Sequence, residues 1–129
     1  MPKNFSLCKD ERLYLREAIS DLFAKGSSFT VFPYRVMYHV LPEDDPQVAR
    51  VAIMTIAPKK KFKHAVDRNR TKRLIREAYR LNKQLLLNAP ALEGRKLDLA
   101  FIWLSDDLFD YPTIENKIKI LLQRIAETL

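Results

Sequence analysis

Basic side chains are concentrated in one short stretch of the sequence, between Lys59 and Arg80. This stretch holds ten Lys and Arg residues and two acids, Asp67 and Glu77, so its formal charge is +8. Because the whole 129-residue chain carries +7, the rest of it sums to −1. A nearly neutral body with one concentrated basic stretch is typical of a protein that binds a polyanion. The ten basic residues are Lys59, Lys60, Lys61, Lys63, Arg68, Arg70, Lys72, Arg73, Arg76 and Arg80.

The spacing within this stretch predicts a long helix over Val66–Leu87. With Arg68 as the origin and about 100° per residue, most of the cations fall on an arc of about 140°, and an apolar stripe that should pack on a sheet lies roughly opposite. Arg70, at about 200°, falls off this arc, so we expect it to reach around, to pair with Glu77 or to serve another surface. The basic arc comprises Arg68, Asn69, Lys72, Arg73, Arg76 and Arg80, and the apolar stripe comprises Leu74, Ala78, Leu81 and Leu85.

A solvated charged face is the ordinary explanation of such a run of charges. A solvated helix usually interleaves Glu and Lys four residues apart, whereas this arc has almost no acidic partners. Like charges on one arc repel each other, and a polyphosphate would relieve that repulsion. We therefore expect the arc to bind nucleic acid. Asn69 is expected to form a hydrogen bond with a sugar hydroxyl or a base edge. The alternative is that its side chain forms hydrogen bonds with nearby backbone groups at the start of the helix.

The sequence shows no residue set for catalysis by the protein or for a metal held by it. Cys8 is the single cysteine, and His39 and His64 lack a ligand set. No nucleophile–base pair and no phosphate-cradling glycine loop are visible. Three acids before the last helix are interpreted as a polar loop that caps it, with a metal site as the alternative. These acids are Asp106, Asp107 and Asp110.

The remaining pattern predicts one α+β domain over residues 1–129, with a small sheet and helices packed on it. No signal peptide and no membrane span are visible, so we expect a cytoplasmic protein with no membrane partner. Before the basic helix, we expect a helix over Tyr14–Lys25 with Gly26 as its C-cap, a strand over Phe29–Val40 with an edge or bulge at Pro33, and a strand over Arg50–Ala57 antiparallel to it. After the basic helix, we expect a central strand over Leu97–Leu104, with Phe101 and Trp103 in the core, and a last helix from Pro112. The inward stripe of this last helix comprises Ile114, Ile118, Leu121, Leu122 and Ile125.

The string from Ala65 to Arg80 closely resembles the signature of the bacterial ribonuclease P protein subunit. The family's core of Ala-Val-x-Arg-Asn-Arg-x-Lys-Arg, followed by Arg-Glu and an aromatic residue, is present here residue by residue. The resemblance extends over nearly the whole chain. Its further matches are Arg12-Leu13, Phe23 to Gly26, Tyr38, Lys59-Lys60-Lys61 and Asp98.

This resemblance implies a fold and a division of labour. The fold would be an α/β sandwich with a small mixed sheet, in which the crossover through the basic helix is left-handed, against the usual rule. The activity would be the endonucleolytic 5′ maturation of transfer RNA, with the chemistry carried by a catalytic RNA and by Mg²⁺ held mainly by that RNA. The implied partners are the ribonuclease P RNA and precursor tRNA, with no obligate protein partner.

The resemblance also implies two binding surfaces. The catalytic RNA would contact the basic helix and the lysine connector. The single-stranded leader would lie in a groove between the first helix and the sheet, where aromatic residues stack on its bases. The implied RNA-binding residues are Arg68, Asn69, Arg70, Lys72, Arg73, Arg76, Arg80, Lys59, Lys60 and Lys61, and the implied leader-binding residues are Phe23, Tyr38, Ile19, Lys60 and Lys61.

Two departures from the family pattern affect these expectations. Ile19 stands where the family often has an aromatic residue, so one stacking platform is missing. Lys63-His64 replaces the usual Gly-Asn before the signature, which puts the local turn in question.

Core packing is the alternative for Phe23 and Tyr38. A non-catalytic RNA-binding protein is the competing class, and a DNA-binding helix is less favoured because no helix-turn-helix pair is visible.

Overall fold

The computed structural model describes residues 11–13, 15–47 and 49–129. Cys8 and Tyr14, which the sequence analysis named, lie outside the described residues. The elements in chain order are α1 (Arg16–Lys25), β1 (Ser27–Val31), β2 (Tyr34–Pro42), β3 (Val51–Ile56), α2 (Ala65–Asn82), α3 (Gln84–Leu87), the 3₁₀ turn η3 (Pro90–Leu92), β4 (Arg95–Trp103) and α4 (Tyr111–Thr128).

The four strands form one mixed sheet in the order β1-β2-β4-β3. β1 pairs antiparallel with β2, β2 pairs antiparallel with β4, and β3 pairs parallel with β4. The predicted α+β class and the central place of the strand around Phe101 are therefore confirmed. β3 runs antiparallel to β2, as expected, but the two strands do not pair because β4 lies between them. The hand of the β3–α2–β4 crossover stays a prediction.

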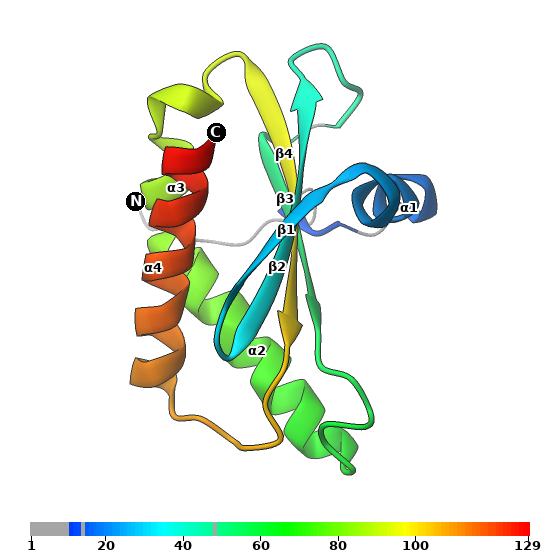
Figure 1. The fold of residues 1–129 in the computed structure, drawn as a ribbon, viewed down its shortest axis with the longest axis vertical. Helices are drawn as coiled ribbons and strands as arrows, with labels where there is room; N and C mark the ends of the chain where they lie inside the picture. The colour runs from blue at the N-terminus through cyan, green and yellow to red at the C-terminus, as the bar shows by residue number, and fades with distance from the viewer. Residues whose placement is uncertain (1–10, 14, 48) are drawn as a thin grey trace.

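The two faces of the sheet carry different helices (Figure 1). One face packs against α2 and α4 around the main core, which includes Phe101 and Trp103 as predicted. The other face carries α1 alone, over a smaller apolar cluster that includes Leu22, Met37 and Ala100. Successive strand residues point to opposite faces, so each strand position belongs to one cluster or the other. α1 covers only part of its face, which leaves room for a groove beside it.

The strand expected over Phe29–Val40 is two strands joined by a tight turn at Phe32-Pro33. Proline has no N–H to donate to a ladder, which favours a chain reversal at this point over a continuous strand. Gly26 caps α1 as expected, with its N–H donating to the carbonyl of Leu22 at 2.9 Å. Its φ of −73° is ordinary, so the reason for glycine here is space.

The last helix follows the prediction closely. All five residues of the expected stripe are fully buried in the main core. The side chain of Asp110 accepts a hydrogen bond from the N–H of Thr113 at 3.2 Å, which caps the first turn of α4. This hydrogen bond confirms the capping interpretation for Asp110 among the three acids.

The basic helix differs from its prediction in length and in its buried side. It ends at Asn82, and the short α3 follows after Lys83. The predicted apolar stripe ran through this junction, so Leu81 and Leu85 are 41% and 40% exposed instead of packed. The buried side of α2 is therefore rotated away from the predicted stripe, and Tyr79 packs on the sheet with its ring centre 6.1 Å from that of Phe101. The buried residues of α2 are Thr71, Ile75, Ala78 and Tyr79.

Candidate RNA interface

The outward side of α2 carries the most accessible part of the predicted basic arc. Asn69 and Arg73 are exposed, and Lys72 is half-buried. The shift of the buried side toward Ile75 and Tyr79 places these exposed residues opposite the sheet contact. No described carboxylate lies within ion-pair distance of Arg73 or Lys72. This part of the helix therefore offers uncompensated positive charge to solvent.

Two arginines of the arc lie at its edge and are anchored to the protein. The Nη1 atom of Arg68 donates to the carbonyl of Phe62 at 2.9 Å. The Nη1 atom of Arg76 donates to the Oγ1 atom of Thr55 on β3 at 3.2 Å. Burial and the neighbouring cations Arg12 and Arg73 lower the pKa of Arg76 from its ordinary value. Each guanidinium keeps further donors for an external ligand, so these anchors position the groups rather than use them up.

The other two arginines of the signature helix point toward the α4 side. Arg70 donates to the carbonyl of Phe109, in the loop before α4, at 3.2 Å. This confirms that Arg70 lies off the arc. Of the alternatives given for Arg70, pairing with Glu77 is not found, because Glu77 pairs with Arg80 three residues on. The hydrogen bond from Arg80 holds the pKa of Glu77 below its usual range.

The lysine connector leads from the end of β3 into α2. Lys59 and Lys60 are exposed, whereas the ammonium group of Lys61 lies 3.8 Å from the carboxylate of Asp106. His64 occupies the N-cap position of α2 with an extended backbone and no side-chain cap. The connector thus extends the positive surface beyond the helix N-terminus.

A groove of about 800 Å³ lies between α1, the α1 side of the sheet and the loop from β2 to β3. Its floor includes His39 and Asp98, which are direct partners on neighbouring strands. Asp98 is buried, and its Oδ1 atom has no hydrogen-bond partner among the described residues. Burial raises the pKa of Asp98 to about 6, while a hydrogen bond from Gln47 opposes the shift.

The three predicted leader residues other than the lysines do not share this groove. Ile19 packs in the small cluster beneath α1, and Phe23 is exposed on α1. Tyr38 lies on the opposite face of the sheet, half-buried, with its ring 6.1 Å from that of Phe29. The expected common groove for Phe23 and Tyr38 is therefore wrong. Because Met37 faces α1, strand alternation sends Tyr38 to the α4 side.

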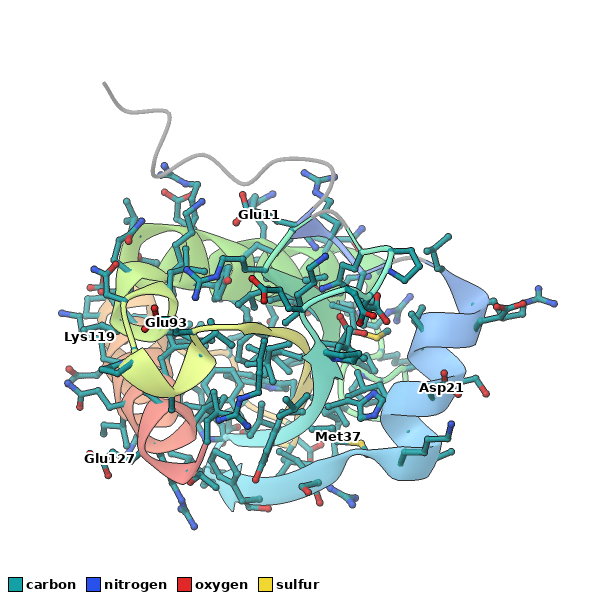
Figure 2. The ribbon with its side chains drawn as sticks, turned by 90° about the horizontal axis from the view of Figure 1, so that it is seen from above. Glu11, Asp21, Met37, Glu93, Lys119 and Glu127 are labelled. Carbon is teal, nitrogen blue, oxygen red and sulfur yellow. The ribbon has the colours of Figure 1, made fainter. Side chains whose placement is uncertain are left out.

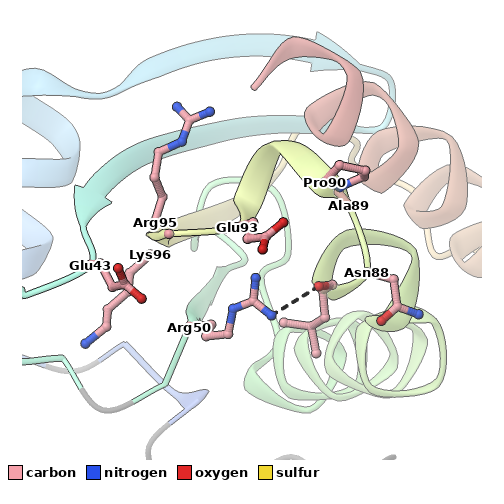
Figure 3. A pocket seen from close by; sticks show the side chains of 10 residues that line it. Glu43, Arg50, Asn88, Ala89, Pro90, Glu93, Arg95 and Lys96 are labelled. Atoms are coloured by element: carbon pink, nitrogen blue, oxygen red, sulfur yellow. Dashed lines mark hydrogen bonds between the residues drawn. The ribbon is translucent and has the colours of Figure 1, made fainter.

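A second pocket, of about 540 Å³, lies at the opposite end of the sheet from the start of α2 (Figure 3). Arg50 reaches across it and donates to the carbonyl of Leu87 at 3.3 Å. Glu43, Glu93 and Arg95 also line it. Its mixed charges contrast with the outward side of α2, where no described carboxylate pairs with Lys72 or Arg73.

These features define a class: an α+β protein with a nearly neutral body and a basic helix that presents uncompensated arginine to a polyanion. The family model for ribonuclease P matches residues 7–126. The ribonuclease P protein component of Porphyromonas gingivalis is 45% identical over 97% of this chain and 90% of its own length. That of Chlorobaculum tepidum is 38% identical over 68% of this chain and 60% of its own length.

The fold agrees with these matches. The solved structure of the ribonuclease P protein from Thermotoga maritima superimposes with a TM-score of 0.69 at 25% identity, over 88% of this chain and 96% of that one. The chain belongs to the ribonuclease P protein family. It is a protein subunit of the ribonucleoprotein endoribonuclease that processes the 5′ end of transfer RNA, and its partner is the ribonuclease P RNA. Within the described part of the chain, no helix is long and apolar enough to span a membrane.

Proposed function

We propose that two separate surfaces of this chain hold the two RNAs of the reaction. The outward side of α2, with the connector before it, binds the ribonuclease P RNA. The α1 side of the sheet receives the single-stranded 5′ leader of precursor tRNA. The observation that carries this proposal is the concentration of exposed, uncompensated cations on α2 and its connector, on a body that is otherwise nearly neutral.

The α2 surface suits a structured RNA because its contacts would be made mostly to phosphate. Arg73 and Asn69 are exposed at its centre, and Arg68 and Arg76 are held in place along its edge. Preset guanidinium groups lose less side-chain entropy on binding and form bidentate bonds with phosphate. Arg70 and Arg80 are engaged within the protein, so they contribute charge to the surface more than direct contacts.

The leader surface rests on α1. Phe23 is 42% exposed there and is available as a stacking platform. Stacking of a base on an aromatic ring tolerates any sequence, as the processing of many precursors requires. Ile19 is partly covered and supports α1 from beneath. Lys60, exposed in the connector, supplies the basic flank. Tyr38 takes no part in this surface, because it faces α4.

In this division of roles, the partner RNA holds the magnesium ions of the reaction. The charged groups exposed on α2 and its connector are mainly cations, and cations weaken the repulsion between two polyanions. The chain would thus lower the magnesium concentration that the RNA needs. Added to a bacterial ribonuclease P RNA, it is expected to stimulate leader removal at low magnesium.

Affinities for precursor and mature tRNA, measured with the assembled ribonucleoprotein, test the leader surface. Phe23→Ala should weaken precursor binding by roughly ten- to a hundredfold, the value of one stacked base, and leave mature tRNA binding nearly unchanged. Tyr38→Phe is the matched aromatic control and should leave both affinities unchanged. If Phe23→Ala weakened the binding of precursor and mature tRNA equally, that result would contradict the leader surface. The α2 surface would still be supported if this variant stimulated cleavage as strongly as the unaltered chain does.

A further inference from the structure

Residues 11–13, here called the N-terminal strap, run along the free edge of the sheet. β3 is an edge strand, because β4 pairs with only one of its sides. On the other side, Arg12 forms a parallel bridge with Ile53, and the N–H of Leu13 donates to the carbonyl of Ile53 at 2.7 Å. The strap therefore continues the sheet beyond β3 and lies beside α2.

Two side chains anchor the strap on opposite faces. Leu13 is buried in the small cluster on the α1 side, with Leu22 and Ala52. Glu11 forms a salt bridge with Lys83, at the end of α2, at 3.1 Å. Figure 2 shows Glu11 alongside α2. These anchors fix the backbone of Arg12, which lies between them.

The anchored backbone directs Arg12 toward α2. Leu13 points to the α1 side. Arg12 is paired with Ile53 in the parallel bridge and therefore shares its face of the sheet. Ile53 packs in the core with Ile75 of α2. Arg76 lies one residue after Ile75 and donates to Thr55, two residues after Ile53. The strap and the helix thus bring two guanidinium groups together at the edge of β3.

Two arginines of α2 and one of the strap carry positive charge here without acidic compensation. Arg73 lies one turn before Arg76 on α2, and burial together with the charges of Arg12 and Arg73 lowers the pKa of Arg76 from its ordinary value. In residues 11–13, 15–47 and 49–129, no carboxylate forms an ion pair with any of the three. Positive charges on neighbouring positions repel one another, so an anion bound among them would favour docking of the strap.

We propose that Arg12, Arg73 and Arg76 form one binding site for a backbone phosphate of the partner RNA, and that its occupancy holds the N-terminal strap against β3. The inference rests on the proposed function of α2 and adds to it a residue from outside the helix. Arginine donors on two elements match the several oxygens of one phosphate group. A ligand that binds only the docked strap must also stabilise docking, because the two equilibria are linked.

The salt dependence of binding to ribonuclease P RNA tests the site. Arg12→Gln should reduce the slope of log K against log salt by about 0.7–0.9, the value of one lost phosphate contact. Arg12→Lys should retain the slope, because it retains the charge. Arg35→Gln, an exposed arginine on β2, is the matched control and should behave as the unaltered chain does. Thermal melting of each variant checks that the fold is intact.

The outcomes separate the site from the wider proposal. A slope unchanged by Arg12→Gln but reduced by Arg73→Gln would overturn the shared site and leave α2 as the RNA surface. A slope unchanged by both would overturn the α2 surface as well. Hydrogen exchange of the Leu13 amide supplies the second readout. Partner RNA should slow its exchange in the unaltered chain and much less in Arg12→Gln, and equal slowing in both would overturn the coupling to docking.

Discussion

The ammonium group of Lys83 lies 3.1 Å from both carboxylate oxygens of Glu11, and this contact joins the end of α2 to the N-terminal strap. The Lys83 side chain is only 5% exposed and that of Glu11 14%. Charges removed from water to this extent depend on each other, because an unpaired charge in the same place would lack both water and a partner. The pair therefore fixes which part of α2 the strap meets.

Glu11→Gln should lower the free energy of unfolding by about 3–5 kcal/mol, because it removes a negative charge that lies against the buried ammonium group of Lys83. Chemical denaturation at neutral pH measures the change. Glu17→Gln, at an exposed position of α1, is the control and should cost less than about 0.5 kcal/mol. The double variant Glu11→Leu with Lys83→Met should recover much of the loss. Similar stabilities for Glu11→Gln and Glu17→Gln would show that the pair does not stabilise the fold.

Arg70 and Arg73 should differ in function although they are three residues apart on one helix. Arg70 is engaged with the carbonyl of Phe109, whereas Arg73 is exposed. Arg73→Gln should lower the salt slope of RNA binding by about 0.7–0.9 and leave stability unchanged. Arg70→Gln should destabilise the chain by about 1–2 kcal/mol, since it releases the loop before α4, and should alter the slope less. The reverse pattern would mean that the Arg70 anchor opens when RNA binds.

Gly26→Ala should destabilise the chain by about 1–3 kcal/mol, because the added methyl group has no space. A Cβ atom at this position would lie 2.4 Å from the carbonyl oxygen of Leu22 and 2.8 Å from that of Tyr38. Both are backbone atoms, so α1 would have to move away from β2. Thermal melting compared with Ser27→Ala, the exposed neighbour, measures the cost. A melting temperature equal to that of the control would show that α1 shifts freely.

Asp98 should make the chain less stable as the pH rises through the mildly acidic range. Its pKa is about 6 in the folded state and 3.8 ordinarily, so between these values the folded chain binds the extra proton. Stability from this group is complete below about pH 4 and falls by up to about 3 kcal/mol by pH 7. Asp98→Asn should flatten that part of the stability profile, and Asp107→Asn should not. A profile unchanged by Asp98→Asn would show that the carboxyl finds a partner.

Local patterns in the sequence predict where helices and strands lie better than they predict which elements pair with one another. The stripe of α4 and the central strand around Phe101 follow from periodicity and composition, which depend only on nearby residues. At Pro33 the sequence predicts an edge or a bulge, whereas the structure has a turn. The missing N–H of proline is compatible with all three. The strap was not predicted, because one bridge at Ile53 and one ion pair at Lys83 have no periodic signal.

The candidate site shows the same division. The signature string identified α2, but its orientation depends on Tyr79 and Ile75, whose burial is set by β4 and α4 rather than by the helix itself. The projection assumed a continuous helix through Lys83 and so assigned Leu81 and Leu85 to the core. For Tyr38, alternation along β2 pointed to the correct face, since Val36 and Val40 share its side. The family match outweighed that pattern and gave the wrong face.

The place of β4 in the sheet has a consequence for synthesis of the chain on the ribosome. β2 and β3 are made first, yet neither pairs with the other, and both wait for a strand that begins at Arg95. Until that strand emerges, the nascent polypeptide holds a β1–β2 hairpin, an open β3 edge and a basic helix with no sheet to cover. The ribosome is itself built largely of RNA, so the arginines of α2 are made beside a polyanion before the chain can close around its own core.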